Sequence, residues 1–204
     1  MANTQRRAEI VAAALDLLDE KGVDAVSLRA VADRLGVRLN TVSWHIKTKA
    51  RLLELMADAV LADLSLAELP EQWQARLREL AHRYRAALLR HRDGARVVAG
   101  TFAAEEHTLR VGEAFLACLL DGGLTEREAM WTSWTVIYFV LGLVQEEQGA
   151  VDAVAEVLTA AVSPQAHPAL TRARAHLGGG GFDQRFEFGL DLIIRSAAEL
   201  TRSS

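Results

Sequence analysis

The sequence predicts an all-α protein, and three features support that class. Half of the 204 residues are hydrophobic, which argues against intrinsic disorder and provides a substantial core. Only three residues are proline, Ala and Leu are abundant, and runs of β-branched or aromatic residues are few. Apolar residues also recur at helical spacing. We expect two units, a head of residues 1–48 and a body of residues 49–204.

The head is predicted to contain three helices. The first covers about Thr4 to Lys21, and Ser27 is a residue type that caps a second helix over Leu28–Leu35. Gly36 ends that helix, and a tight turn leads into a third helix over Thr41–Lys47. The apolar residues of the last two helices are spaced to form one small core: Val31, Leu35, Val37, Val42 and Ile46. Two short helices joined by such a turn make a helix-turn-helix.

The body is predicted to consist of further helices. A linking helix over residues 49–66 comes first, followed by helices over residues 71–91, 95–100, 103–120, 125–148 and 183–200. Thr125 and Glu128 have the spacing of a capping box. The most apolar run, Val136–Val144, is too short to span a bilayer. The helix over residues 125–148 is apolar nearly all round from Met130 to Val144, so we expect it to be buried on most sides. Residues 149–182, with their prolines and glycine run, are expected to be mobile.

Charge and cysteine content narrow the function classes. Residues 1–50 hold eight Lys and Arg against six Asp and Glu, whereas the whole chain has a net charge of −4. A mildly basic head on an acidic body suits DNA binding by the head with little unspecific adhesion by the body. Cys118 is the sole cysteine, which excludes an intramolecular disulfide and a cysteine-rich zinc site, and it is expected to be buried. Because no apolar run of signal-peptide length begins the chain, we expect a cytoplasmic protein without membrane contact.

The segment LGVRLNTVSWHIKTKARLL, residues 35–53, contains the strongest functional candidate. In a helix-turn-helix the second helix enters the major groove, where its first residues contact base edges while neighbouring groups hold phosphates. That role needs short hydrogen-bonding side chains and cations, which this segment supplies. Arg29, at the start of the preceding helix, has a two-pronged donor suited to guanine. The predicted DNA-binding residues are Arg29, Arg38, Leu39, Asn40, Thr41, Ser43, Trp44, His45 and Lys49.

Other interpretations of the chain stay open at this point. A few cations on a helix are commonly a solvated surface, although an exposed indole at Trp44 favours a partner. A helical protein-interaction module would leave the polar residues Thr41–Lys49 without a role. We expect no enzyme, because the sequence contains no phosphate-binding glycine loop, no G-x-S-x-G and no H-E-x-x-H. Glu79 and His82 form a single Glu-x-x-His, whereas a helical di-iron site requires two.

The first 55 or so residues resemble the DNA-binding domain of the TetR family of repressors. TVSWHIKTKARLLELMADAV, residues 41–60, is similar to the family's recognition helix and the linking helix after it. The body resembles the tetracycline-repressor subgroup in ALLRHRDGARVVAGT (87–101), LGLVQEEQ (141–148) and FEFGLDLII (186–194). The resemblance implies a ligand-responsive repressor that binds a palindromic operator as a homodimer. Helices 125–148 and 183–200 of two copies would form a four-helix interface.

The resemblance also assigns roles within the head. It implies base and phosphate contacts from matching positions, which are Arg29, Thr41, Trp44, His45 and Lys49. The sequence departs from the family at Ser43, where a tyrosine against the DNA backbone is usual, and at Leu39 and Asn40. We therefore expect DNA binding with an operator sequence of its own.

The residues that hold magnesium and tetracycline in that subgroup are not retained. The positions that match two histidines, one of them the metal ligand, and an asparagine hold other residues: Val98, Ser65 and Leu80. Ala114 replaces a glutamine that contacts the drug, while Thr101 and Glu146 match the metal's outer shell. Because magnesium requires oxygen or imidazole ligands, we expect no metal, no cofactor and a more apolar effector.

The predicted ligand cavity combines apolar and aromatic side chains with a few polar groups, which suits a large and partly aromatic molecule. Its residues are Tyr84, Val98, Thr101, Phe102, Ala114, Met130, Trp134 and Ile137. The alternatives are that these are ordinary core residues and that Trp131 and Trp134 belong to the dimer interface. Ligand binding is expected to shift the linking helix and to change the separation of two recognition helices.

Overall fold

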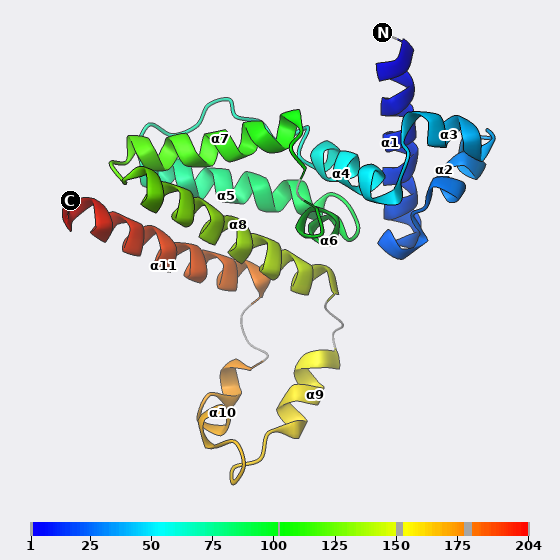
Figure 1. Cartoon of the computed structure of the whole chain (residues 1–204). Helices are drawn as coiled ribbons and strands as arrows, with labels where there is room; N and C mark the ends of the chain where they lie inside the picture. The colour runs from blue at the N-terminus through cyan, green and yellow to red at the C-terminus, as the bar shows by residue number, and fades with distance from the viewer. Residues whose placement is uncertain (1, 102, 150–152, 178–180, 204) are drawn as a thin grey trace.

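The computed structural model describes residues 2–101, 103–149, 153–177 and 181–203, and within them every regular element is a helix. The head contains α1 (Ala2–Lys21), the short η1 (Val23–Ala25), α2 (Leu28–Arg34) and α3 (Leu39–His45). The body contains α4 (Lys49–Val60), α5 (Trp73–Leu89), α6 (Gly94–Ala99), α7 (Glu106–Asp121), α8 (Glu126–Gly149), α9 (Ala153–Ala161), α10 (Pro168–Arg172), η2 (Arg174–His176) and α11 (Phe182–Ser203). Figure 1 shows the head at one end of the molecule, joined to the body through α4. The predicted all-α class is confirmed.

In the head, α2 and α3 pack together and against α1. The Ser27 hydroxyl caps α2 by accepting a hydrogen bond from the Ala30 N–H at 3.1 Å. Gly36 follows α2 with a φ of 64°, a left-handed conformation that glycine adopts without steric cost. The side chains between the helices are fully buried at Val31, Val42 and Ile46. These contacts confirm the predicted helix-turn-helix and its small core.

Several helix boundaries differ from those predicted. α3 ends at His45 rather than at residue 47, because Ile46 is extended and turns its side chain into the core. The linking helix α4 ends at Val60 rather than at residue 66, and Leu64 is buried outside the helix. α7 begins at Glu106 rather than at residue 103, after an extended Glu105. The buried side chains of Ile46 and Leu64 thus lie outside helices, which local periodicity does not reveal.

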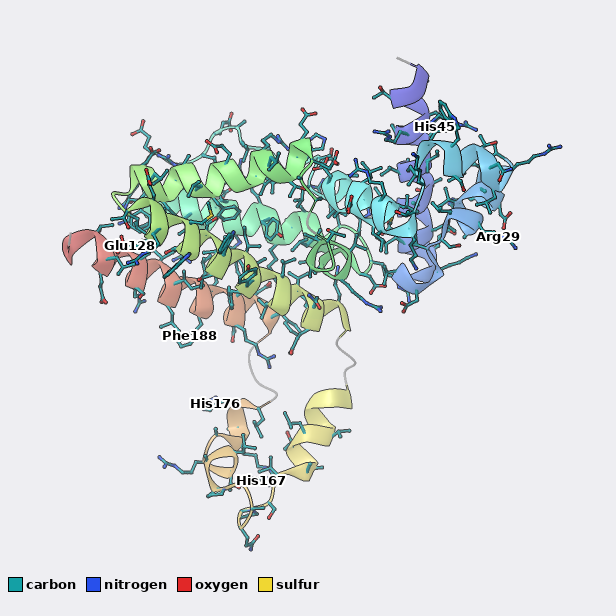
Figure 2. The ribbon with its side chains drawn as sticks, viewed as in Figure 1. Arg29, His45, Glu128, His167, His176 and Phe188 are labelled. Carbon is teal, nitrogen blue, oxygen red and sulfur yellow. The ribbon has the colours of Figure 1, made fainter. Side chains whose placement is uncertain are left out.

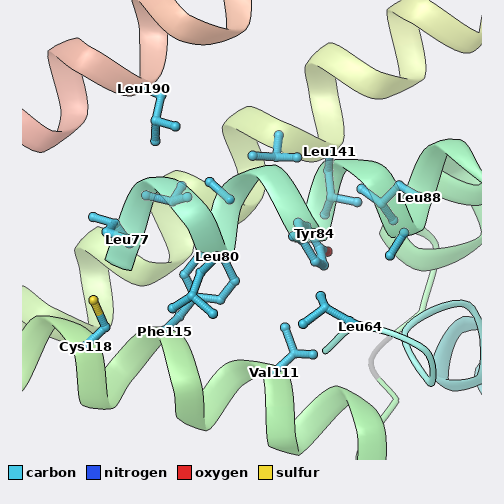
Figure 3. Packing of buried hydrophobic residues seen from close by; sticks show 14 of the residues in the cluster. Leu64, Leu77, Leu80, Tyr84, Leu88, Val111, Phe115, Cys118, Leu141 and Leu190 are labelled. Atoms are coloured by element: carbon cyan, nitrogen blue, oxygen red, sulfur yellow. The ribbon is translucent and has the colours of Figure 1, made fainter. Parts of the chain in front are cut away.

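The body is built around α5, α7, α8 and α11, which pack against one another in Figure 1. Figure 3 shows their shared core, in which the aromatic ring of Phe115 is fully buried next to Leu80. Cys118 is buried in the same core, as predicted, and its thiol donates to the Trp73 carbonyl at 3.3 Å. Burial raises the pKa of this thiol to about 11, so it stays protonated near neutral pH. The capping box is also present, because Thr125 and Glu128 exchange hydrogen bonds at the start of α8.

The head and the body also meet away from α4. The Asp19 carboxylate of α1 lies 2.9 Å from Nδ1 of His91, between α5 and α6. Asp24 of η1 pairs with Arg96 of α6 at 3.0 Å. The head is therefore attached to the body both through α4 and through the region around α6. A displacement of either attachment will change how the head is oriented.

The segment predicted to be mobile, residues 149–182, contains α9, α10 and η2 in its described part. Figure 1 shows α9 and α10 projecting away from the body. Three residues of the glycine run, 178–180, lie outside the described residues. Mobility of this segment stays a prediction. Among the residues that the structure describes, no helix has both the length and the apolar character needed to cross a membrane.

Candidate functional site

α3 presents polar and aromatic side chains on the outside of the head. Trp44 is 72% exposed, and its ring meets the His45 ring edge-on, with 4.7 Å between centroids. Figure 2 shows His45 and Arg29 on the head, at the opposite end of the molecule from Glu128. The other predicted DNA-binding residues are exposed (Arg38, Asn40, Thr41 and Lys49) or half-buried (Leu39 and Ser43). All nine predicted positions are therefore accessible, while Val42 fixes the opposite side of α3 in the core.

The start of α3 differs from the prediction in a way that bears on DNA contact. The helix begins at Leu39, two residues before the predicted start, after an extended Arg38. Asn40 and Thr41 consequently lie in its first turn, the part of a recognition helix that contacts base edges. Thr48 caps α4 by accepting from the Arg51 N–H at 3.0 Å, which fixes Lys49 at the first position of α4. The structure thus brings Lys49 and the first turn of α3 to the same end of the molecule.

A cavity of about 610 Å³ lies in the body, within the size range of small-molecule sites. Its wall is formed by α5, α6, α7 and α8, together with the residue that follows α4 and the segment before α7. The lining residues are mostly apolar: Leu61, Tyr84, Val98, Ala99, Thr101, Ala103, Ala104, Thr108, Leu109, Val111, Gly112, Trp134, Ile137, Tyr138, Leu141, Gly142 and Gln145. None of these is charged, so the wall suits an uncharged and largely apolar molecule.

Tyr84 on α5 places a phenol hydroxyl in this wall. Figure 3 shows Tyr84 between α7, which carries Val111, and α8, which carries Leu141. The Tyr84 side chain is 3% exposed, and among the described residues its hydroxyl has no hydrogen-bond partner. Burial raises the pKa of the phenol, so it remains a protonated donor at neutral pH. Because this hydroxyl faces the cavity without a protein partner, a ligand acceptor there would gain a hydrogen bond worth about 0.5–1.5 kcal/mol.

The structure brings together most of the residues predicted for the cavity. Five of them line it: Tyr84, Val98, Thr101, Trp134 and Ile137. Ala114 and Met130 are not among the described lining residues. Both are half-buried, and the α7 residues that do line the cavity, from Thr108 to Gly112, all precede Ala114. Phe102 lies outside the described residues.

The prediction missed several lining residues on α8, although a signal for them was present. Tyr138, Leu141, Gly142 and Gln145 continue the helical stripe that starts at Trp134, at intervals of three and four residues. Extending the periodicity would have found them. The residues of α7 carry no comparable signal, because their contribution depends on where that helix begins.

The cavity does not fit a magnesium ion. Its described lining contains no carboxylate and no imidazole, and the side chain of Val98, at the position that the resemblance matches to the metal ligand, offers only carbon. Ser65 is exposed and Leu80 is fully buried, and neither lines the cavity. Thr101 lines it, but its hydroxyl donates to the Val98 carbonyl at 3.1 Å. Glu146 is exposed and absent from the wall.

The outer surface of α8 and α11 is apolar and uncovered in the single chain. α8 was expected to be buried on most sides, yet Trp131 is 58% and Tyr138 63% exposed. On α11, Phe188 is 68% and Leu192 54% exposed. Single-chain packing therefore leaves a large apolar surface, of the kind that marks an interaction site. Trp134, 47% exposed, lines the cavity and also lies on this helix, so the two roles proposed for it are compatible.

A helix-turn-helix head and a helical body with an apolar cavity together define a class of protein, the ligand-responsive DNA-binding regulators. Comparison with known families makes the assignment specific. Residues 10–56 match the family model for bacterial regulatory proteins of the tetR family. Residues 66–198 match the model for the tetracyclin repressor-like C-terminal domain. The chain belongs to the TetR family of transcriptional regulators, with an N-terminal DNA-binding domain and a C-terminal ligand-binding domain.

Individual relatives agree with this assignment. The chain is 36% identical over 192 residues to the tetracycline repressor protein class D of Escherichia coli, covering 93% of this chain and 87% of that protein. A structure of ActR from Streptomyces coelicolor in complex with actinorhodin matches with a TM-score of 0.87 and 26% identity, covering 96% and 97% of the two chains. A structure of BioQ with its double-stranded DNA operator matches with a TM-score of 0.73 and 25% identity, covering 95% and 98% of the two chains.

Proposed function

We propose that this protein is a repressor whose dimer binds a palindromic operator and dissociates when an uncharged, largely aromatic molecule enters the cavity. The main support is that one chain has an exposed polar helix, α3, and an apolar cavity. In that cavity the Tyr84 hydroxyl has no hydrogen-bond partner among the described residues. The proposal includes a cytoplasmic location, no catalytic activity and no resident cofactor or metal.

On the DNA side, the proposal assigns the contacts to the nine accessible residues of the head. Asn40, Thr41 and Ser43 are short hydrogen-bonding side chains at the start of α3, where base edges are read. Arg29 and Lys49 flank that helix and supply charge for a guanine edge or for phosphates. The similarity to BioQ, solved with its DNA operator, supports this arrangement.

On the ligand side, the wall chemistry points to an aromatic molecule without a metal. The cavity has no charged lining residue, and its polar groups are hydroxyls, an indole and the Gln145 amide. Such groups orient a ligand through its carbonyl or hydroxyl groups while the apolar wall provides most of the affinity. ActR, which this chain resembles in fold, has been solved with actinorhodin. We propose this kind of effector in place of magnesium-tetracycline.

The dimer is assigned to the exposed apolar surface of α8 and α11. Regulators of this family act as dimers, and a two-fold dimer matches a palindromic operator whose half-sites lie one helical turn apart. Because that geometry tolerates little change in the separation of the two α3 helices, a small shift of α4 would release the DNA. A useful repressor needs a coupling of about 1–3 kcal/mol between ligand and operator.

The first experiment selects bound duplexes from a random pool and sequences the winners. Palindromic sites are expected. Tryptophan fluorescence then follows binding of two probes, a neutral anthraquinone alone and minocycline with magnesium, because Trp134 lies in the cavity wall. We expect the metal-free aromatic probe to bind and to weaken operator affinity. Tighter binding of minocycline only when magnesium is present would contradict the metal-free proposal.

Salt dependence separates this function from a protein-interaction module without a DNA role. If phosphates are contacted, log affinity for the operator falls with log salt by about 0.9 per contact. Lys49→Ala should weaken binding to all duplexes and reduce that slope by about 0.9. Lys21→Ala, on the same head at the end of α1, is the control and should leave the slope unchanged. A flat salt dependence in the unmodified protein would favour the interaction module.

A further inference from the structure

A carboxylate on the linking helix caps a helix of the cavity wall. Asp58 Oδ1, on α4, accepts a hydrogen bond from the Thr108 N–H at 2.7 Å and another from the Thr108 hydroxyl at 3.0 Å. The first N–H groups of a helix lack partners within it, and negative charge there is favoured. The N-cap residue of α7 itself, Glu105, makes no side-chain cap bond. The cap of α7 is therefore supplied by α4.

Two further polar contacts join the same helices. Arg51, near the start of α4, lies 2.6 Å from Glu105. Arg110 of α7 donates to the Ala62 carbonyl at 3.0 Å, just beyond the end of α4, where helix carbonyls need partners. Each helix thus caps the other, an anion at the start of α7 and a cation at the end of α4. Asp58 is 9% exposed, and such burial of a carboxylate is tolerated because it is hydrogen-bonded.

The contact between Asp58 and Thr108 lies between the cavity and the head. Thr108, Leu109, Val111 and Gly112, in the first two turns of α7, all line the cavity. At its other end α4 starts with Lys49 of the DNA surface, and it packs against α1 of the head. A ligand that displaces the start of α7 moves Thr108, and the two hydrogen bonds move Asp58 with it.

We propose that Asp58 is a positioning residue that transmits occupancy of the cavity to the DNA-binding head through Thr108. This inference rests on the proposed function, because it requires operator affinity to depend on what fills the cavity. It adds a defined route: short, directional bonds between α7 and α4, rather than general packing, carry the displacement.

A test needs no identified ligand, because a side chain can fill the cavity. Gly112 lines the cavity, and a Cβ added there meets no atom within 4 Å, so Gly112→Leu adds a side chain at the wall without a clash at its Cβ. In the otherwise unmodified protein we expect Gly112→Leu to lower operator affinity about tenfold, a typical allosteric coupling. With Asp58→Asn also present, the two charge-assisted bonds from Thr108 become weaker neutral ones, and we expect the same filling to lower affinity by only about two- to threefold.

The controls separate transmission from a structural role. Asp63→Asn removes an acid that follows α4 and is 84% exposed, and the Gly112→Leu effect should persist there in full. Circular dichroism and sedimentation check that each variant is folded and dimeric. Thr108→Val, which removes only the 3.0 Å bond, is the second variant if Asp58→Asn does not fold, and it should reduce the effect partly.

The possible outcomes distinguish transmission through Asp58 and Thr108 from a purely structural role of these residues. A smaller Gly112→Leu effect in the Asp58 or Thr108 variant, with a full effect beside Asp63→Asn, supports the inference. An equal effect in all backgrounds overturns it, even if Asp58→Asn weakens operator binding by itself. Absence of any Gly112→Leu effect in a protein that binds its operator also overturns it. Failure of the unmodified dimer to bind any duplex would instead refute the proposed function.

Discussion

At the scale of a single residue, Tyr84 combines the packing of a core residue with a polar group that can contact a ligand. Its ring packs edge-on against Phe115, with 6.1 Å between centroids, as an ordinary core aromatic would. Its hydroxyl, however, lies in the cavity wall without a protein partner among the described residues. The ring thus serves the fold, and the hydroxyl is available for a ligand.

Tyr84→Phe tests this division of roles. Because the hydroxyl has no partner to lose, thermal stability of the free protein should stay the same or rise slightly. Affinity for a neutral aromatic probe such as an anthraquinone, whose carbonyl can accept from the hydroxyl, should fall by about three- to tenfold, the value of one hydrogen bond. Tyr138→Phe, at an exposed residue of the same wall, is the control and should change affinity less. A clear loss of thermal stability in Tyr84→Phe would show that the hydroxyl has a structural partner.

Residues close in sequence were predicted well, and residues brought together by folding were not. Ser27, the capping box at Thr125 and the stripe from Trp134 to Ile137 all follow from local patterns. Asp58 and Thr108 do not, because they are 50 residues apart and neither type is unusual on a helix. The same reason explains the cavity residues missed on α7. Local periodicity predicts which surface of a helix is apolar, but not where a distant side chain will cap it.

At the scale of helices, α8 and α11 approach each other closely at Gly189. A Cβ built on Gly189 would lie 2.3 Å from Cζ of Phe139, well inside contact distance. The Phe139 ring is held in place, because it stacks on Phe186 with 6.1 Å between centroids and 16° between planes. Gly142, by contrast, lies on α8 with no atom within 4 Å of an added Cβ. Of these two helical glycines, only Gly189 is required by close packing against a neighbouring helix.

Substitution by alanine should separate these two glycines. Gly189→Ala is expected to destabilise the protein by about 1–3 kcal/mol, because overpacking forces the two helices apart. Gly142→Ala should stabilise it by about 0.5–1 kcal/mol, because alanine is the better helix former. Chemical denaturation of both variants at the same protein concentration measures the difference. Equal changes in free energy of unfolding would show that α8 and α11 do not approach as closely as described.

At the scale of the whole molecule, the apolar surface of α8 and α11 links assembly to DNA binding. One head contacts one half-site, and joining two heads makes the second contact intramolecular, which raises affinity without new contacts. The surface carries Trp131, Tyr138, Phe188 and Leu192, all more than half exposed in the single chain. Its apolar character is explained if a second copy covers it.

Phe188→Arg should therefore act on DNA binding although Phe188 lies on the body, far from α3 in Figure 2. A cation at the centre of an apolar interface has no partner there, so the dimer should dissociate. Sedimentation should report a monomer, and operator affinity should fall by about a hundredfold or more as the second contact is lost. Each head should remain folded, because the buried cluster that includes its core contains no residue of α8 or α11. Weak binding to a single half-site should thus persist.

Leu120→Glu, at an exposed apolar residue of α7, is the matched control and should stay dimeric. A Phe188→Arg protein that is monomeric yet binds the full operator with unchanged affinity would separate assembly from DNA binding.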